Sequence, residues 1–269
     1  MISLADYEFD EVPLSETVMR VLANVRLDFP AEQVRQQLAN LVEEAKEDLR
    51  DIKGQELQLE QLLKLFFTQW GFGAAKGVYQ FSDTIWLDKV LDTREGAPVT
   101  LGIILLHLAE ELDLPLMPVI FPTQLILRAD WLDEEMWLIN PLNGETLSEH
   151  LLEVWLKGHI GANVSLEDED LDEAENVTII RKLLGTLKGA LMQEEQLELA
   201  LQSSELLLTF DQTDPYEIRD RGLIYAQLDC NNVAINDLNY FVEQCPDDPV
   251  AEVIKIQIHS IEERDIILH

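Results

Sequence analysis

The chain has 269 residues, of which 47% are apolar, so it is long enough to bury a core in each of two domains. It carries 52 Asp and Glu residues against 19 Lys and Arg, a formal net charge of -33. Such a charge repels nucleic-acid phosphates and anionic membrane surfaces. We therefore expect no nucleic-acid or membrane partner and favour a protein or peptide, a basic one included. A simpler role for the charge, keeping the protein soluble and monomeric, stays open.

The N-terminus and the cysteines indicate where the protein works. The first ten residues carry three acidic side chains and no apolar run, and no stretch is long enough to span a bilayer, so we expect a cytoplasmic protein. Cys230 and Cys245 are expected at the two ends of one helix, roughly 22 Å apart, which is too far for a disulfide. The five histidines have no metal-ligand spacing. We expect no metal or other cofactor.

The first third of the chain is predicted to be helical. Apolar residues recur with helical periodicity from 14 to 70, and Pro30 suits the first turn of a helix. Three glycines between Gly71 and Tyr79 predict a loop. The stretch from Pro98 to Leu112 is apolar nearly all round, which is typical of a helix buried in a core.

Three short strands are predicted next. Runs rich in Val, Ile, Leu and Trp are separated by Pro122 and by the polar turn at 133–135, and these runs are Leu116–Phe121, Gln124–Arg128 and Met136–Ile139. A buried helix against a small antiparallel sheet is an α+β arrangement. We therefore expect a mostly helical α+β domain over residues 1–165.

An acidic segment follows the predicted first domain. Residues 166–175 carry seven carboxylates, which repel one another and cannot form a core alone. We expect the domain linker at 166–178; a solvated loop within one domain is the alternative.

The remainder, 179–269, repeats with a period of 34 residues. Residues of matching type lie 34 positions apart in four pairs, namely Ala200 and Ala234, Leu207 and Phe241, Asp214 and Asp248, and Pro215 and Pro249. A helix-turn-helix period of this length is the tetratricopeptide signature. We expect an all-α repeat domain whose last helix begins at Pro249.

Several motifs in the middle of the chain resemble the SirB-type transglutaminase-like family. They are Trp86–Leu91 (WLDKVL), Arg94–Leu101 (REGAPVTL), Phe121–Arg128 (FPTQLILR), Leu138–Gly144 (LINPLNG) and Arg219–Gly222 (RDRG). The resemblance runs from about residue 30 onward. It implies a transglutaminase-like fold, followed by helical repeats, and a regulatory role is attached to the SirB name.

The resemblance also implies that a catalytic trio is missing. In active relatives a cysteine at the start of the buried helix, a histidine and an aspartate carry the chemistry, and alignment with the family pattern places these roles on Thr100, Gln124 and Asn140. A threonine hydroxyl does not ionise without a base, and glutamine has no titratable group. Asn140 could still hydrogen-bond to Gln124 in place of the Asp–His pair. The opposing interpretation keeps Thr100 as a nucleophile with another base, for which His107 is the candidate; it is two helical turns, roughly 10 Å, away.

Two further groups of residues could bind ligands. The aromatic run from Phe66 to Phe72 could line a groove, although residues at such spacing more often fill a core. Arg219 and Arg221 could capture an acidic peptide terminus, but in so acidic a chain a structural role beside carboxylates is favoured.

The sequence thus predicts a non-catalytic protein-interaction or regulatory protein, a degenerate transglutaminase-like pseudoenzyme. The alternative is a hydrolase or acyltransferase with Thr100 as an altered nucleophile. A third class is a purely structural subunit of a larger complex.

Overall fold

A computed structural model describes residues 12–77, 80–132 and 136–267. The described residues form two compact units, and the division falls between Leu183 and Leu184, inside helix α7. We call these the N-terminal unit and the C-terminal unit. The predicted turn at 133–135, the acidic N-terminus and the end of the predicted loop at Val78 and Tyr79 lie outside the described residues.

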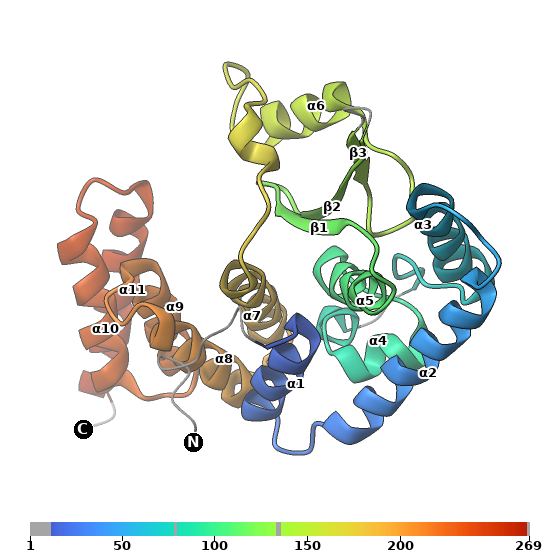
Figure 1. The fold of residues 1–269 in the computed structure, drawn as a ribbon. Helices are drawn as coiled ribbons and strands as arrows, with labels where there is room; N and C mark the ends of the chain where they lie inside the picture. Colours follow the sequence, from blue (N-terminus) through green and yellow to red (C-terminus); the bar gives the residue numbers. More distant parts are fainter. Residues whose placement is uncertain (1–11, 78–79, 133–135, 268–269) are drawn as a thin grey trace. The chain divides into compact units, whose positions relative to one another are not determined.

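Helices open the N-terminal unit, as predicted. Its helical elements, including the π-helix η2 and the 3-10 helices η3 and η4, are α1 (Leu14–Val25), α2 (Ala31–Leu49), α3 (Gln55–Lys64), η2 (Leu65–Gln69), η3 (Phe81–Thr84), α4 (Leu87–Thr93), α5 (Pro98–Glu111), α6 (Glu149–His159), η4 (Asp168–Leu171) and the start of α7 (Asn176–Gln193). Helices α1, α2 and α4 pack around α5, whose residues are buried on nearly every side (Figure 1). The prediction of a central buried helix is confirmed.

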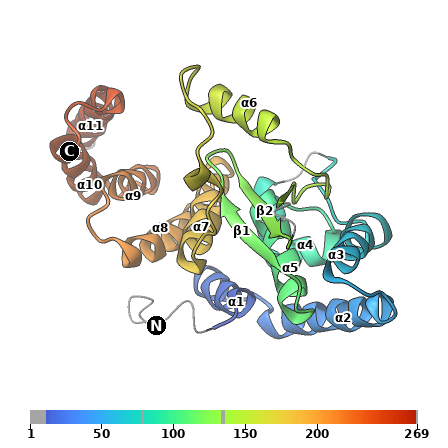
Figure 2. The ribbon, with the colours of Figure 1, turned by 45° about the horizontal axis from the view of Figure 1, so that its top comes forward.

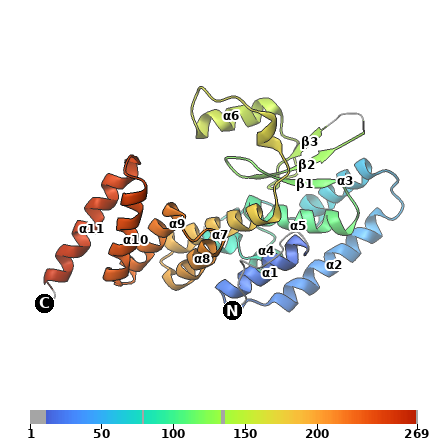
Figure 3. The same cartoon turned by 60° about the vertical axis from the view of Figure 1, so that its left-hand side comes forward.

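A three-stranded antiparallel sheet lies against α5. Its strands, in the order β1-β2-β3, are β1 (Leu116–Ile120), β2 (Leu125–Asp130) and β3 (Met136–Ile139). The sheet separates α5 from α6, so that this part of the unit has three layers, seen from the side in Figure 3. The predicted strands agree with these bounds to within two residues, because Pro122 and the change of period are local signals. The fold is α+β, as expected.

The second face of the sheet has its own apolar cluster. Side chains of β1, β2 and β3 meet α6 and η4 there, and the buried members are Val119, Phe121, Ile126, Leu138, Leu147, Leu152, Leu156 and Leu171. Leu171 lies in the acidic segment predicted as a linker. The backbone there is also held, because Ala174 N donates to Pro118 O and Arg128 donates to Leu171 O. The linker at 166–178 stays a prediction, although part of this segment packs on the sheet.

The C-terminal unit is a run of antiparallel helices. After the end of α7 it contains α8 (Leu197–Phe210), α9 (Pro215–Gln227), α10 (Asn231–Gln244) and α11 (Pro249–Ile267). Successive helices from α8 to α11 pack against one another, as the turned views show (Figures 2 and 3). Ala200 and Ala234 are fully buried. The predicted repeats are confirmed, and α11 begins at Pro249 as expected.

Capping residues explain where two repeat helices begin. The Asp214 carboxylate accepts from Tyr216 N at 2.9 Å and from Glu217 N at 3.3 Å, and Pro215 occupies the first helical turn. Asp248 accepts from Val250 N in the same way before α11. The Asp-Pro pairs found 34 residues apart are therefore N-terminal helix caps. Both cysteines are free and flank α10, as predicted.

Candidate functional site

Thr100 lies in the first turn of α5, where the family pattern places a nucleophile. Its side chain is almost fully buried, with 1% of the residue exposed. The hydroxyl donates to Ile85 O at 3.2 Å, and Ala97 N, just before the helix, donates to Thr84 O. The hydroxyl thus links the start of α5 to the segment before α4.

Gln124 and Asn140 lie at the ends of neighbouring strands. Gln124 comes just before β2, and its Nε2 atom is buried with no hydrogen-bond partner among the described residues. Asn140 follows β3, and its Oδ1 accepts from Leu142 N at 3.0 Å within a turn closed by Gly144 N to Asn140 O. Gln124 Nε2 therefore does not donate to Asn140 Oδ1, so the hydrogen bond considered from the sequence is not formed in this direction.

The scaffold that would hold these positions is nevertheless intact. Gly102, two residues after Thr100, faces β2 so closely that an added Cβ would overlap the side chain of Leu125, which follows Gln124. Helix α5 can approach the sheet only because Gly102 has no side chain. The start of the helix and the start of β2 are thus held close together.

The aromatic run beside this scaffold is mainly core. Phe66 and Phe72 are buried and stacked, with ring centroids 4.2 Å apart, and the Arg94 guanidinium lies 4.5 Å from the Phe72 centroid. Phe67 packs on the turn after β3, where a Cβ at Gly144 would come within 2.5 Å of the ring. Phe66 and Phe72 fill a core as expected, whereas Phe67 and Trp70 are half-buried.

A shallow cavity of about 450 Å³ opens beside Gln124. It is lined by residues from the start of β2 and from α6, namely Thr123, Gln124, Val154, Trp155, Gly158 and His159. The Oγ1 atom of Thr123 is buried and, like Nε2 of Gln124, has no partner among the described residues. His159 is exposed. The cavity thus lies beside the position at which the family pattern expects a histidine.

His107 does not act on Thr100. Its Nδ1 atom lies 3.1 Å from Ser15 Oγ in α1, and the residue faces a different cavity between α1, α2 and α5. Burial lowers the pKa of His107, and the nearby Glu111 carboxylate opposes that shift. The sequence argument that two helical turns separate the two residues agrees with this placement.

The arginines of the RDRG motif are each bound by a carboxylate. Arg219 donates from Nε and NH2 to Asp220 Oδ1 at 2.9 and 2.6 Å, and its guanidinium also lies over the rings of Tyr216 and Phe241. Arg221 makes a two-point contact with Asp237 of α10. The hydrogen bonds that Arg221 donates to Asp237 raise the pKa of Arg221. These contacts favour the structural role for both arginines.

A buried cation that sequence reasoning missed lies next to them. Lys188 is 5% exposed, and its Nζ donates to both carboxylate oxygens of Glu217 at 2.8 and 2.7 Å and to Asp220 at 2.7 Å. Ser204 Oγ donates to Glu217 as well. One network of charges therefore joins α7, α8 and α9. Its only sequence signal is a lysine on the apolar side of a helix.

Two further features were considered in the described part of the chain: a metal site and a membrane-spanning helix. No group of three or more His, Cys, Asp or Glu side chains could hold a metal ion there. None of the helices found in that part has the length and apolar character needed to cross a membrane.

The fold defines a class: a transglutaminase-like domain followed by tetratricopeptide repeats. Comparison with known families agrees. Residues 32–185 match the model of the transglutaminase-like superfamily, and residues 187–259 match a tetratricopeptide repeat model.

Full-length relatives identify the family. The chain is 58% identical over 269 residues, all of both chains, to UPF0162 protein YchA of Escherichia coli (strain K12) and to Protein SirB1 of Salmonella typhimurium (strain LT2). It is 41% identical over 261 residues, 97% of each chain, to a UPF0162 protein of Vibrio cholerae. The chain belongs to this YchA and SirB1 family. No solved structure matches it.

Proposed function

We propose that this chain is a non-catalytic, cytoplasmic pseudoenzyme that binds a protein or peptide partner and has a regulatory role. The burial of Thr100 carries the proposal. Only 1% of Thr100 is exposed, and its hydroxyl already donates a hydrogen bond to Ile85 O. The side chains at the positions of the base and of its orienting acid are amides, those of Gln124 and Asn140. A nucleophile needs access to the substrate and a proton acceptor within about 3 Å. Neither condition is met.

The alternative is a hydrolase or acyltransferase that uses Thr100. It would require the first turn of α5 to open and a base to replace Gln124. His107 is engaged with Ser15, so it does not supply that base. The geometry therefore favours binding over catalysis.

The repeat match supports a protein partner, and α11 offers a surface for it. Val250, Val253 and Ile256 recur every three residues along α11 and are exposed, Ile256 at 71%. Stacked helical repeats bury such faces against a neighbour. We propose that this face contacts the partner and that the charge of -33 favours a basic one.

Arg219 and Arg221 are the other proposed binding residues. A peptide carboxylate would have to displace Asp220 or Asp237 to reach them. We therefore propose that they shape the repeat surface, and that any direct capture of an acidic terminus requires exchange of these ion pairs.

A chemical probe separates the two functional classes. The protein is treated with a fluorophosphonate or an acyl electrophile, and labelled peptides are mapped by mass spectrometry. We expect no label at Thr100. Labelling in the wild type that disappears in Thr100→Ala would overturn the non-catalytic proposal.

A binding experiment tests the proposed surface. Partners are captured from the source cells with the wild type, with Val253→Glu/Ile256→Glu and with Thr100→Val. A stoichiometric partner should be retained by Thr100→Val and lost by the α11 variant, and its binding should weaken as salt rises. A partner held equally by all three proteins would contradict the role of α11, and a partner lost only by Thr100→Val would favour the enzyme.

A further inference from the structure

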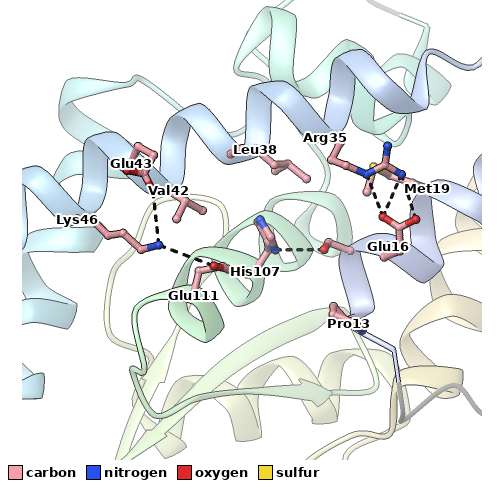
Figure 4. A pocket seen from close by; sticks show the side chains of 12 residues that line it. Pro13, Glu16, Met19, Arg35, Leu38, Val42, Glu43, Lys46, His107 and Glu111 are labelled. Atoms are coloured by element: carbon pink, nitrogen blue, oxygen red, sulfur yellow. Dashed lines mark hydrogen bonds and ion pairs between the residues drawn. The ribbon is translucent and has the colours of Figure 1, made fainter.

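A cavity of about 390 Å³ lies between α1, α2 and α5, within the N-terminal unit. Figure 4 shows Leu38 and Val42 of α2 above it and His107 of α5 below. An ion pair lies at each end, Glu16 with Arg35 at one and Lys46 with Glu43 and Glu111 at the other. The volume is in the range of small-molecule sites, and an apolar wall with few polar groups is typical of them.

His107 presents one polar atom to this cavity. Its Nδ1 is bonded to Ser15 Oγ, and Nε2 makes no hydrogen bond to any group among the described residues. Ser15 is buried and its Oγ lies within hydrogen-bond distance of Nδ1, so donation from the hydroxyl to Nδ1 satisfies both groups. We assign the imidazole proton to Nε2 on this ground. In that tautomer an N–H donor faces the cavity.

The charges around the cavity indicate an uncharged ligand. Arg35 is held by Glu16 at 3.0 Å and also by Glu32, while Lys46 lies 3.5 Å from Glu43 and 3.9 Å from Glu111. Both lining cations are therefore already matched by carboxylates. A ligand carboxylate would find no spare cation and three acidic neighbours, and a ligand cation would have to leave water for a mainly apolar wall.

We propose that this cavity is a binding site for a small uncharged molecule with an apolar body and a carbonyl or comparable acceptor. The acceptor takes a hydrogen bond from Nε2–H of His107, and the body lies against Leu38, Val42 and Met19. The site belongs to the N-terminal unit and is independent of the partner surface proposed for α11.

Three matched probes test the ligand class on the full chain. N-cyclohexylacetamide, cyclohexaneacetate and cyclohexylmethylammonium share a ring and differ in charge. The imidazole carbon-bound protons of His107 are followed by NMR during each titration. The acetamide should give a saturable shift, and the two ions should bind at least about fivefold more weakly, the loss expected when one hydrogen bond or one desolvated charge is mismatched. Absence of a saturable His107 shift, or tightest binding by either ion, would overturn the proposal.

Two leucine substitutions on α2 locate the site. Ala39 lines the mouth of the cavity and is exposed, so Ala39→Leu narrows the mouth with little strain on the fold; Gln33→Leu adds the same side chain to the same helix outside the cavity. Affinity for the acetamide should fall at least about tenfold in Ala39→Leu and stay at the wild-type value in Gln33→Leu. His107→Leu should lose about fivefold. Unchanged affinity in Ala39→Leu would overturn the site even if His107→Leu fails to fold.

Discussion

Arg221 of α9 and Asp237 of α10 form a two-point ion pair, with Nε 2.7 Å from Oδ2 and NH2 2.9 Å from Oδ1. The Asp237 side chain is 11% exposed and that of Arg221 28%. A planar guanidinium matches a carboxylate in this geometry, and a lysine ammonium does not. The pair therefore fixes the crossing of two repeat helices.

We predict that Arg221→Met lowers the free energy of unfolding of the repeats by about 2 kcal/mol, because a nearly buried carboxylate loses its partner. Arg221→Lys should restore only part of the loss. Urea unfolding followed by circular dichroism measures both. Lys255→Met, which removes an exposed pair with Glu252 in the same unit, is the control and should cost under about 0.5 kcal/mol. Equal effects at Arg221 and Lys255 would show that the two-point pair is not structural.

Two glycines on neighbouring helices should respond oppositely to alanine. A Cβ at Gly222 would lie 2.9 Å from Asp237 Cβ and 3.1 Å from the Leu238 side chain, whereas one at Gly189 meets no described atom within 4 Å. Gly222→Ala should destabilise by about 1 to 3 kcal/mol through overpacking. Gly189→Ala should stabilise by up to about 1 kcal/mol, because alanine favours a helix interior. Thermal unfolding measures both, and stabilisation by Gly222→Ala would contradict the close α9–α10 crossing.

Much of the fold could be predicted because its signals are local. Pro98, the apolar stretch after it and Pro122 fix the buried helix and two strands within short windows. The 34-residue repeat and the Asp-Pro pairs likewise predict where α9 and α11 begin. The π-helix η2, at Leu65–Gln69, had no such signal, since an aromatic run at helical spacing fits an α-helix equally well.

The candidate site depended on contacts that sequence does not show. The family pattern placed Thr100, Gln124 and Asn140, but burial of Thr100 depends on the carbonyl of Ile85 from an earlier segment. Ser15 and His107 are 92 residues apart, and their bond and the cavity beside it arise only when α1, α2 and α5 pack. Periodicity shows which face of a helix is buried, and it does not show which partner covers that face.

A cysteine returned to the nucleophile position should stay inert. In Thr100→Cys the thiol would lie near a helix N-terminus, which favours a thiolate, but it would be buried, and no base is present at 124. We expect iodoacetamide to modify the exposed Cys230 readily and the introduced thiol only as fast as the protein opens. Peptide mapping over time measures both rates. Rapid modification at position 100 in the native protein would mean that the cleft is accessible, and would weaken the pseudoenzyme proposal.

His107 should make the protein less stable in mild acid. Burial lowers the pKa of His107 in the folded chain below its usual 6.5, and the Glu111 carboxylate partly opposes that shift. Glu16, Glu43, Arg35 and Lys46 face the same cavity from α1 and α2. As the pH falls, His107 takes up a proton in the unfolded chain before it does so in the folded chain. This contribution to stability is therefore complete above about pH 6.5 and is lost as the pH falls toward the lower folded pKa.

The matching variant is His107→Gln, which keeps a hydrogen-bonding side chain and does not titrate. The free energy of unfolding, measured by urea between pH 7.5 and 5.5, should fall more steeply in the wild type than in His107→Gln. The acidic side chains titrate in both proteins, so the difference between the two curves isolates the histidine. Parallel curves would mean that folding leaves the pKa of His107 unchanged, which would contradict the effect expected from burial of its ring.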